Sequence, residues 1–165
     1  MHFGDSEPIL WCDSDILWFK ELSSLPTGLK KSSVILKTTE DFQQSYDPNL
    51  LEQKLKHLHE FHFVNTGLVF LKGNLLEACK LKNLINCASK NPHHFSEQTI
   101  LAEAAYQLRQ NYWTLEEINC SYDSYSLILP TFFRKKWVAK HYVSGIRHQL
   151  WQDAFALRIK SIFKI

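Results

Sequence analysis

The chain has 165 residues, of which 45% are hydrophobic and 13% aromatic, a composition typical of a folded protein with a substantial core. Nineteen Lys and Arg stand against seventeen Asp and Glu, and this near balance argues against a general nucleic-acid binder. No apolar run is long enough to span a bilayer, the N-terminus does not resemble a secretory signal, and the four cysteines form no CxxC pair. Together these features favour a cytoplasmic protein with free thiols.

Four segments of the chain are expected to form β-strands. Residues 8–12 are so apolar that we expect this first strand to be buried. Residues 23–33 are rich in turn formers and are expected to form a loop. Later strands are predicted at 34–38, 61–74 and 137–143, and the segment 61–74 is either a strand pair or one bent strand broken at Asn65-Thr66-Gly67.

Apolar residues at helical spacing predict four helices. The first ends near His59, the second is capped by Asn74 and stops before Pro92, the third is capped by Ser96, and the fourth starts at Ile146. In the fourth we expect the apolar side chains to pack against the core: Trp151, Phe155, Ile159, Ile162 and Phe163. Because strands and helices alternate without a visible linker, we expect one α/β domain over residues 1–165, with helices on the faces of a sheet.

Two carboxylates follow the first predicted strand directly. Asp13 and Asp15 are separated by one residue, and side chains at i and i+2 of an extended chain point the same way. Such a pair can bind one hard cation, and ligands of open α/β sheets gather at the carboxyl ends of strands. The alternative is that Asp13 ends the strand and Asp15 caps a turn. Taken alone, the pair favours this alternative.

Two further motifs have both a structural and a functional interpretation. The small polar break at Asn65, Thr66 and Gly67 lets the backbone approach a ligand closely, although a bulge or hairpin turn is the commoner cause. Glu97 and Gln98 open the third helix, where the helix dipole is sufficient to explain a carboxylate. The alternative is that this pair is polar because it borders a binding site.

A late motif, KHYVSGIR, contains His141 flanked by Lys140 and Arg147, with Gly145 between them. An imidazole can complete the coordination sphere of a metal, and two cations can bind phosphate. A single histidine is more often an ordinary polar residue with a hydrogen-bond partner.

The order of these motifs resembles the C-terminal part of a GT-A-fold glycosyltransferase. The matching stretches are the strand that runs into Asp13-Ser14-Asp15, then FVNTGLVFL, SEQT and KHYVSGIRHQLW. The resemblance implies metal-dependent transfer of a sugar from a nucleotide-sugar donor to an acceptor that the sequence does not identify. It also implies a role for each motif. These roles are metal ligands for Mn²⁺ or Mg²⁺ at Asp13, Asp15 and His141, donor contacts at Asn65, Thr66, Gly67, Lys140, Gly145 and Arg147, and catalytic residues facing the acceptor at Glu97 and Gln98.

The resemblance also implies that the fold is truncated. A GT-A fold begins with a βαβ portion that binds the base and ribose, and one βαβ unit needs roughly 30 residues. Only 12 residues precede Asp13. We therefore expect a truncated, Rossmann-like α/β fold, with a mixed sheet flanked by helices and an apolar strand edge left open.

Two other functions remain open from the sequence. One is a non-catalytic remnant or interaction module that keeps part of the fold and pairs with a partner chain, or with a missing N-terminal segment, through the open edge. The other is peripheral membrane contact through the last helix, where Arg158, Lys160 and Lys164 alternate with apolar residues. An ordinary packed amphipathic helix is the favoured interpretation of that segment.

Overall fold

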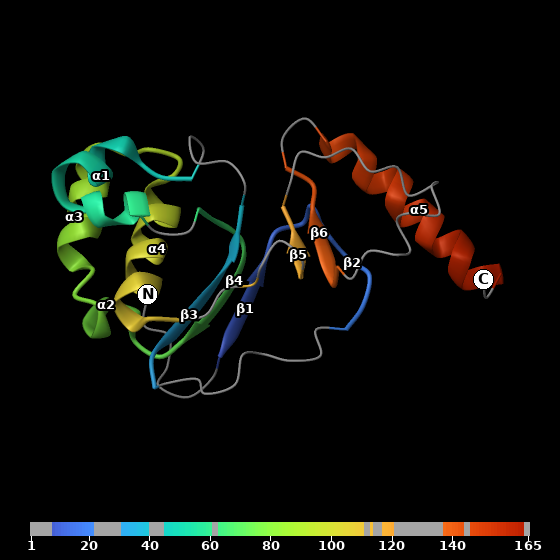
Figure 1. Ribbon diagram of the computed structural model, residues 1–165, viewed down its shortest axis with the longest axis horizontal. Helices are drawn as coiled ribbons and strands as arrows, with labels where there is room; N and C mark the ends of the chain where they lie inside the picture. The colour runs from blue at the N-terminus through green and yellow to red at the C-terminus, as the bar shows by residue number, and fades with distance from the viewer. Residues whose placement is uncertain are drawn as a thin grey trace.

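A computed structural model gives the fold of residues 8–21, 31–39, 45–60, 63–110, 113, 117–120, 137–143 and 146–163 (Figure 1). The described strands form two three-stranded sheets rather than the single sheet expected. The predicted α/β class is confirmed, because helices flank both sheets.

The first sheet has the order β1-β4-β3, with β1 (Ile9–Cys12), β4 (Val64–Lys72) and β3 (Ser33–Thr38). Both pairings are antiparallel. The apolar residues of β3 are fully buried, which agrees with the strand predicted at 34–38.

The segment predicted as a strand pair or a bent strand is one continuous strand with a bulge. Leu36 of β3 pairs with Val69, but the next residue, Lys37, pairs with Asn65. Thr66 to Leu68 are therefore extra residues on β4, as in a β-bulge. The polar break at Asn65-Thr66-Gly67 marks this irregularity and not a hairpin turn.

The second sheet has the order β2-β6-β5, with β2 (Ile16–Trp18), β6 (Ala139–His141) and β5 (Ile118–Asn119). It is mixed, because β2 runs antiparallel and β5 parallel to β6. The chain passes from the first sheet to the second between β1 and β2, and Asp13-Ser14-Asp15 form this crossing.

Five short helices lie together on one side of the first sheet (Figure 1). They are α1 (Pro48–Lys54), the 3-10 helix η1 (Lys56–Glu60), α2 (Leu75–Ala78), α3 (Lys82–Lys90) and α4 (Ser96–Leu108). The largest apolar core lies between these helices and β3 and β4. The long helix α5 (Arg147–Phe163) lies beyond the second sheet, at the opposite end of the molecule.

The helices predicted around His59 and after Asn74 are both interrupted. The first changes from α-helix to 3-10 helix at Leu55, which lets Leu55 and Leu58 both reach the core. Asn74 caps α2 as predicted, since its side chain accepts a hydrogen bond from the backbone N–H of Glu77. Lys80 then adopts a left-handed conformation with φ 50°, and this separates α2 from α3.

Ser96 was predicted to cap α4, but it is the first helical residue of α4, and Phe95 is at the N-cap position. Its hydroxyl donates to Asp47 Oδ2 at 2.6 Å and accepts from the backbone N–H of His93 at 3.1 Å. Asp47 is itself the N-cap of α1 and accepts from the N–H of Asn49. Ser96 therefore ties the starts of two helices together.

Two predictions about burial are wrong. The strand β1 is an edge strand, and Leu10 and Trp11 on it are exposed. The apolar residues of α5 expected to pack inward, Trp151, Phe155, Ile159 and Ile162, are exposed as well. Hydrophobic spacing indicates the type of an element, but not whether another element covers its face. Among the described residues no helix is long and apolar enough to cross a membrane.

Candidate metal centre

Backbone pairing brings Asp13, Asp15 and His141 to one place where the two sheets meet. The N–H of Asp13 donates to the carbonyl of Gly67 on β4 at 2.7 Å, so Asp13 continues the pairing of β1. On the other side, His141 pairs with Ile16, and the N–H of Tyr142 donates to the carbonyl of Asp15 at 2.9 Å. The residues on either side of Ser14 are thus fixed to different sheets.

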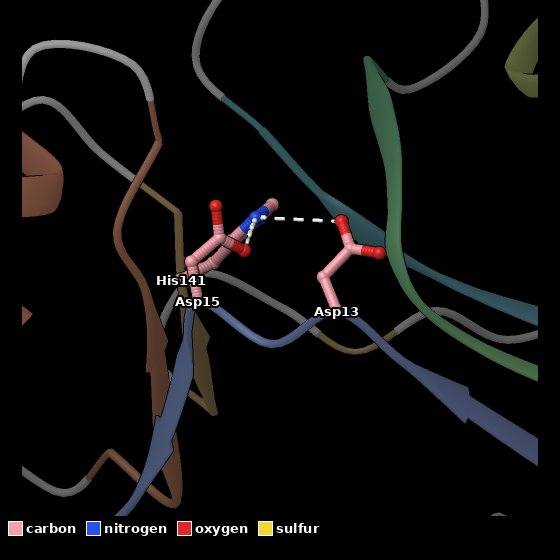
Figure 2. Close-up of side chains that lie close together, drawn as sticks. All are labelled: Asp13, Asp15 and His141. Carbon is pink, nitrogen blue, oxygen red and sulfur yellow. Dashed lines mark ion pairs between the residues drawn. The ribbon is translucent and has the colours of Figure 1, made fainter.

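The three side chains converge (Figure 2). His141 Nε2 lies 2.9 Å from Asp15 Oδ1 and 3.8 Å from Asp13 Oδ2. One ligand atom from each residue lies within 4.8 Å of the others, an arrangement that could hold a metal ion. The expectation that His141 shares a site with Asp13 and Asp15 therefore agrees with the geometry, although 126 positions of sequence separate it from Asp15.

Asp15 Oδ1 is a buried acceptor without a hydrogen-bond donor. The nitrogen His141 Nε2 lies 2.9 Å from it, at ion-pair distance. The other oxygen, Oδ2, accepts a hydrogen bond from Arg147 Nε at 2.7 Å. A buried carboxylate oxygen that lacks a donor is costly unless a cation compensates it.

The ionisation of the cluster favours a bound cation. Burial lowers the pKa of His141 well below its ordinary value, and the charge of Lys37 acts in the same direction, while Asp15 opposes both. The imidazole is therefore neutral near pH 7, which is the form that binds metals. Burial also raises the pKa of Asp13, and the neighbouring charge of Asp15 raises it further. A cation between the two carboxylates would relieve this repulsion.

Gly67 provides the space in which the His141 ring lies. A Cβ built on Gly67 would be 2.3 Å from Cε1 of the imidazole and 2.7 Å from its Nδ1. Atoms cannot approach so closely, so the ring is packed directly against the backbone of β4. Gly67 was predicted to allow close approach of a ligand, and the group that approaches it here is a side chain of the chain itself.

Two residues near the cluster were missed in the sequence, Lys37 and Cys120. Lys37 on β3 is fully buried, and its Nζ lies 2.9 Å from Cys120 Sγ. Cys120 Sγ is in turn 3.8 Å from His141 Nδ1. Burial is the largest influence on Lys37 and lowers its pKa, against the charges of Cys120, Asp13 and Asp15. The sequence offered one signal for Lys37, namely that this lysine directly follows the apolar run Val34-Ile35-Leu36. A lysine at the end of such a strand is ordinarily expected to face solvent.

The side chains of Asn65 in the bulge and of Gln98 on α4 make hydrogen bonds to the backbone. Asn65 Oδ1 accepts from the N–H of Gly67 at 2.8 Å. Gln98 Oε1 accepts from the N–H of Thr66 at 3.0 Å, and Gln98 Nε2 donates to the carbonyl of Ser45 at 2.5 Å. Gln98 is buried, whereas its neighbour Glu97 is exposed on the first turn of α4. Gln98 thus positions the bulge, and the catalytic role expected for Glu97 and Gln98 stays a prediction.

Of the three residues near His141 that were expected to contact phosphate, the structure describes Lys140 and Arg147, and Arg147 reaches the cluster through its contact with Asp15. Lys140 is buried with its Nζ 4.9 Å from the centre of the Tyr142 ring. Successive residues of a strand face opposite sides, so Lys140 points away from the side that His141 occupies. Gly145 lies outside the described residues.

In comparisons with known proteins, no family model, no curated protein and no solved structure matches the chain. Fold and site therefore define its class: an α/β protein in which two small sheets meet at a cluster of two aspartates and one histidine.

Proposed function

We propose that the chain binds a divalent cation through Asp13, Asp15 and His141, and that this centre serves transfer of a sugar from a nucleotide-sugar donor. The convergence of the three side chains is the observation that supports the proposal most directly. A neutral imidazole and two carboxylates offer acceptor atoms toward one another, and Asp15 Oδ1 lacks a donor. A cation is the simplest ligand that satisfies all three groups.

The donor set indicates the kind of cation. Carboxylate oxygens suit Mg²⁺ and Mn²⁺, and an imidazole nitrogen in the set favours Mn²⁺. Neighbouring ligands of a six-coordinate ion with bonds of about 2.1 Å lie about 3 Å apart. The distances from His141 Nε2, 2.9 Å and 3.8 Å, need only a small side-chain adjustment to meet that requirement.

The surroundings suit an anionic ligand that shares the cation. A divalent ion neutralises and polarises phosphate oxygens, which is the chemistry it would supply to a departing nucleoside diphosphate. The Arg147 side chain is 68% exposed, so its guanidinium can donate to phosphate while Nε holds Asp15. Together with the order of the motifs, this arrangement supports a nucleotide-sugar transferase, and the acceptor is left unspecified.

A second candidate function has its own observation. The edge strand β1 exposes Leu10 and Trp11, and an open apolar edge can pair with a strand of another chain. This favours a non-catalytic module that keeps part of the fold and docks a partner. Such a module does not require a metal centre with nucleotide affinity, and this difference separates the two functions.

The deciding experiment is titration of Mn²⁺, followed by electron paramagnetic resonance and calorimetry. The wild type should bind one ion, and a nucleoside diphosphate should bind more tightly with Mn²⁺ than without it. Asp15→Asn and His141→Gln should each lower the affinity for Mn²⁺ by about 10- to 100-fold. Glu52→Gln removes an equivalent charge from an exposed position on α1 and should change nothing. Equal Mn²⁺ binding by all four proteins would exclude this centre, and Mn²⁺ binding without nucleotide affinity would favour the non-catalytic module.

A further inference from the structure

The exposed face of α5 carries a continuous apolar stripe. We call Trp151, Phe155, Ile159 and Ile162 the outer stripe, and their exposed fractions are 77%, 65%, 39% and 66%. Their spacings of four, four and three residues place them within an arc of about 80° around the helix. Single exposed apolar residues are ordinary, whereas four aligned ones over three helical turns are the kind of contiguous apolar surface that marks an interaction site.

The outer stripe is not the face by which α5 packs on the rest of the protein. On the opposite face, Asp153 is buried and accepts a hydrogen bond from the Tyr142 hydroxyl at 2.5 Å. Ala156 packs against Trp137 on the same inner side. Figure 1 shows α5 at the rim of the molecule, beyond the second sheet. The helix is therefore anchored through one face and presents the outer stripe with the other.

Positive charge is concentrated in this part of the chain. Residues 147–165 contain four basic residues and one acidic residue, whereas the rest of the chain contains fifteen basic and sixteen acidic residues. The single acidic residue, Asp153, is buried against Tyr142 and does not contribute to the exposed face. Arg147 and Arg158 are exposed, and helical geometry places both beside Trp151, within about 40°. An aromatic and aliphatic stripe bordered by basic residues is complementary to an anionic surface.

We propose that α5 docks in the plane of a membrane surface that contains anionic phospholipid. The outer stripe enters the boundary between headgroups and acyl chains, and the basic residues contact the phosphates. Trp and Phe suit this position because a bilayer interface favours large aromatic rings. A second copy of the chain fits the stripe less well, because pairing two such helices would bring arginines of both copies together.

Docking would also orient the candidate metal centre. Arg147 begins α5 and donates to Asp15, and Tyr142, next to His141, holds Asp153. The membrane-facing helix is thus joined to the centre at two points. The membrane proposal rests on the outer stripe and the basic residues beside it, and it is independent of whether the centre binds a metal.

The test is sedimentation of the full chain with two kinds of vesicle. One kind contains phosphatidylcholine alone, and the other contains phosphatidylcholine with about 30% phosphatidylglycerol, which gives the surface a negative potential. We expect binding only to the anionic vesicles, and weaker binding as salt increases. Trp151→Ser with Phe155→Ser should reduce the partition coefficient at least about ten-fold. Trp11→Ser with Leu76→Ser removes exposed apolar side chains elsewhere and should bind as the wild type does. Circular dichroism should be the same for all three proteins, because every substituted residue is exposed.

A second measurement locates the helix in the bilayer. Brominated phosphatidylcholine in the anionic vesicles should quench the tryptophan emission of the wild type, and Trp151→Phe should keep binding but lose most of the quenching. Unchanged binding by the double serine variant would overturn the proposal. So would a wild-type dimer that ignores vesicles and becomes a monomer on the same substitutions, because the stripe would then be a contact between copies. Asp15→Asn should still bind vesicles, so a failed metal centre and a failed membrane contact give different results.

Discussion

Gly67 of β4 lies against the imidazole of His141, so closely that a methyl group at this position would overlap the ring. The contact joins the bulge of the first sheet to the last residue of β6 in the second sheet. The backbone N–H of Asp13 donates a hydrogen bond to the carbonyl of this same glycine, so Gly67 positions two of the three candidate ligands. The glycine acts through the space it leaves and not through a left-handed backbone.

The first prediction is that Gly67→Ala displaces the imidazole of His141. The affinity for Mn²⁺ should then fall by about 10- to 100-fold, because the orientation of the ligands sets metal affinity. Crowding of the ring should also lower the free energy of unfolding by about 1–3 kcal/mol. Gly73→Ala is the matched control, since Gly73 has φ 73° and its added Cβ would meet the carbonyl oxygen of Lys31 at 2.4 Å. This variant should lose stability but keep Mn²⁺ affinity in calorimetry. Equal loss of affinity in both variants would mean that Gly67 matters only for folding.

How far the sequence predicts this protein differs from feature to feature. The strands at β1 and β3 follow from apolar runs, and the grouping of Asp13, Asp15 and His141 follows from the order of motifs. The exposure of β1 and α5 does not follow, because local periodicity contains no information about which element covers a face. The role of Gly67 is equally hidden, since it depends on a ring delivered from the other sheet.

Lys37 shows the same limit for a charged residue. A lysine in a short strand is ordinarily placed toward solvent, yet this one is fully buried beside Cys120. The charged groups around it are Cys120, directly after β5, and Asp13 and Asp15 in the link between β1 and β2, and all of them lie far from Lys37 in sequence. Only the three-dimensional arrangement reveals that the candidate centre has an amine as a neighbour.

The second prediction concerns this amine. Because burial lowers the pKa of Lys37, this amine binds a proton more tightly in the unfolded chain than in the folded chain. Removing the amine from water therefore lowers the stability of the native state at pH values where the unfolded chain is protonated. Lys37→Met should therefore raise the free energy of unfolding by about 1–3 kcal/mol near pH 7. The advantage should shrink as pH approaches the ordinary lysine pKa of about 10.4, where the unfolded chain also loses its proton. Urea unfolding at both pH values measures the change.

Lys54 provides the control for Lys37. Its Nζ makes a similar contact with Cys87 Sγ at 3.0 Å, but this pair lies at the surface. Lys54→Met should change stability by less than about 0.5 kcal/mol. If Lys37→Met destabilises the protein while Lys54→Met does not, the buried amine contributes a favourable interaction that outweighs its desolvation.

The third prediction follows from the neutral state of His141. Its pKa lies below the ordinary value of 6.5 in the folded chain, so below that pH the unfolded chain binds a proton that the folded chain does not. The free energy of unfolding should therefore fall as the solution is acidified, by up to about 1.4 kcal/mol per pH unit from this residue. His141→Gln should reduce the slope between about pH 6.5 and pH 5, measured by urea unfolding with a chelator present. His148→Gln, at an exposed position of α5, should keep the wild-type slope.

The last prediction concerns the attachment of α5. The Tyr142 hydroxyl donates to Asp153 Oδ2, and both residues are buried, so this bond fixes the inner face of the helix to the end of β6. Burial is the main reason that the pKa of Tyr142 is raised above its ordinary value, so the hydroxyl is protonated and able to donate at neutral pH. Tyr142→Phe leaves the carboxylate of Asp153 without this donor and should cost about 1.5–3 kcal/mol of stability. Ser89→Ala, which removes an exposed hydroxyl that donates to the carbonyl of Ile85 on α3 at 2.8 Å, should cost less than about 0.5 kcal/mol. Because α5 begins at Arg147, a loosened helix should also weaken the hold of Arg147 on Asp15, so Tyr142→Phe should reduce Mn²⁺ affinity whereas Ser89→Ala should not. Thermal unfolding and Mn²⁺ titration of the two variants check both effects. A Tyr142→Phe protein as stable as the wild type would show that the bond does not anchor α5.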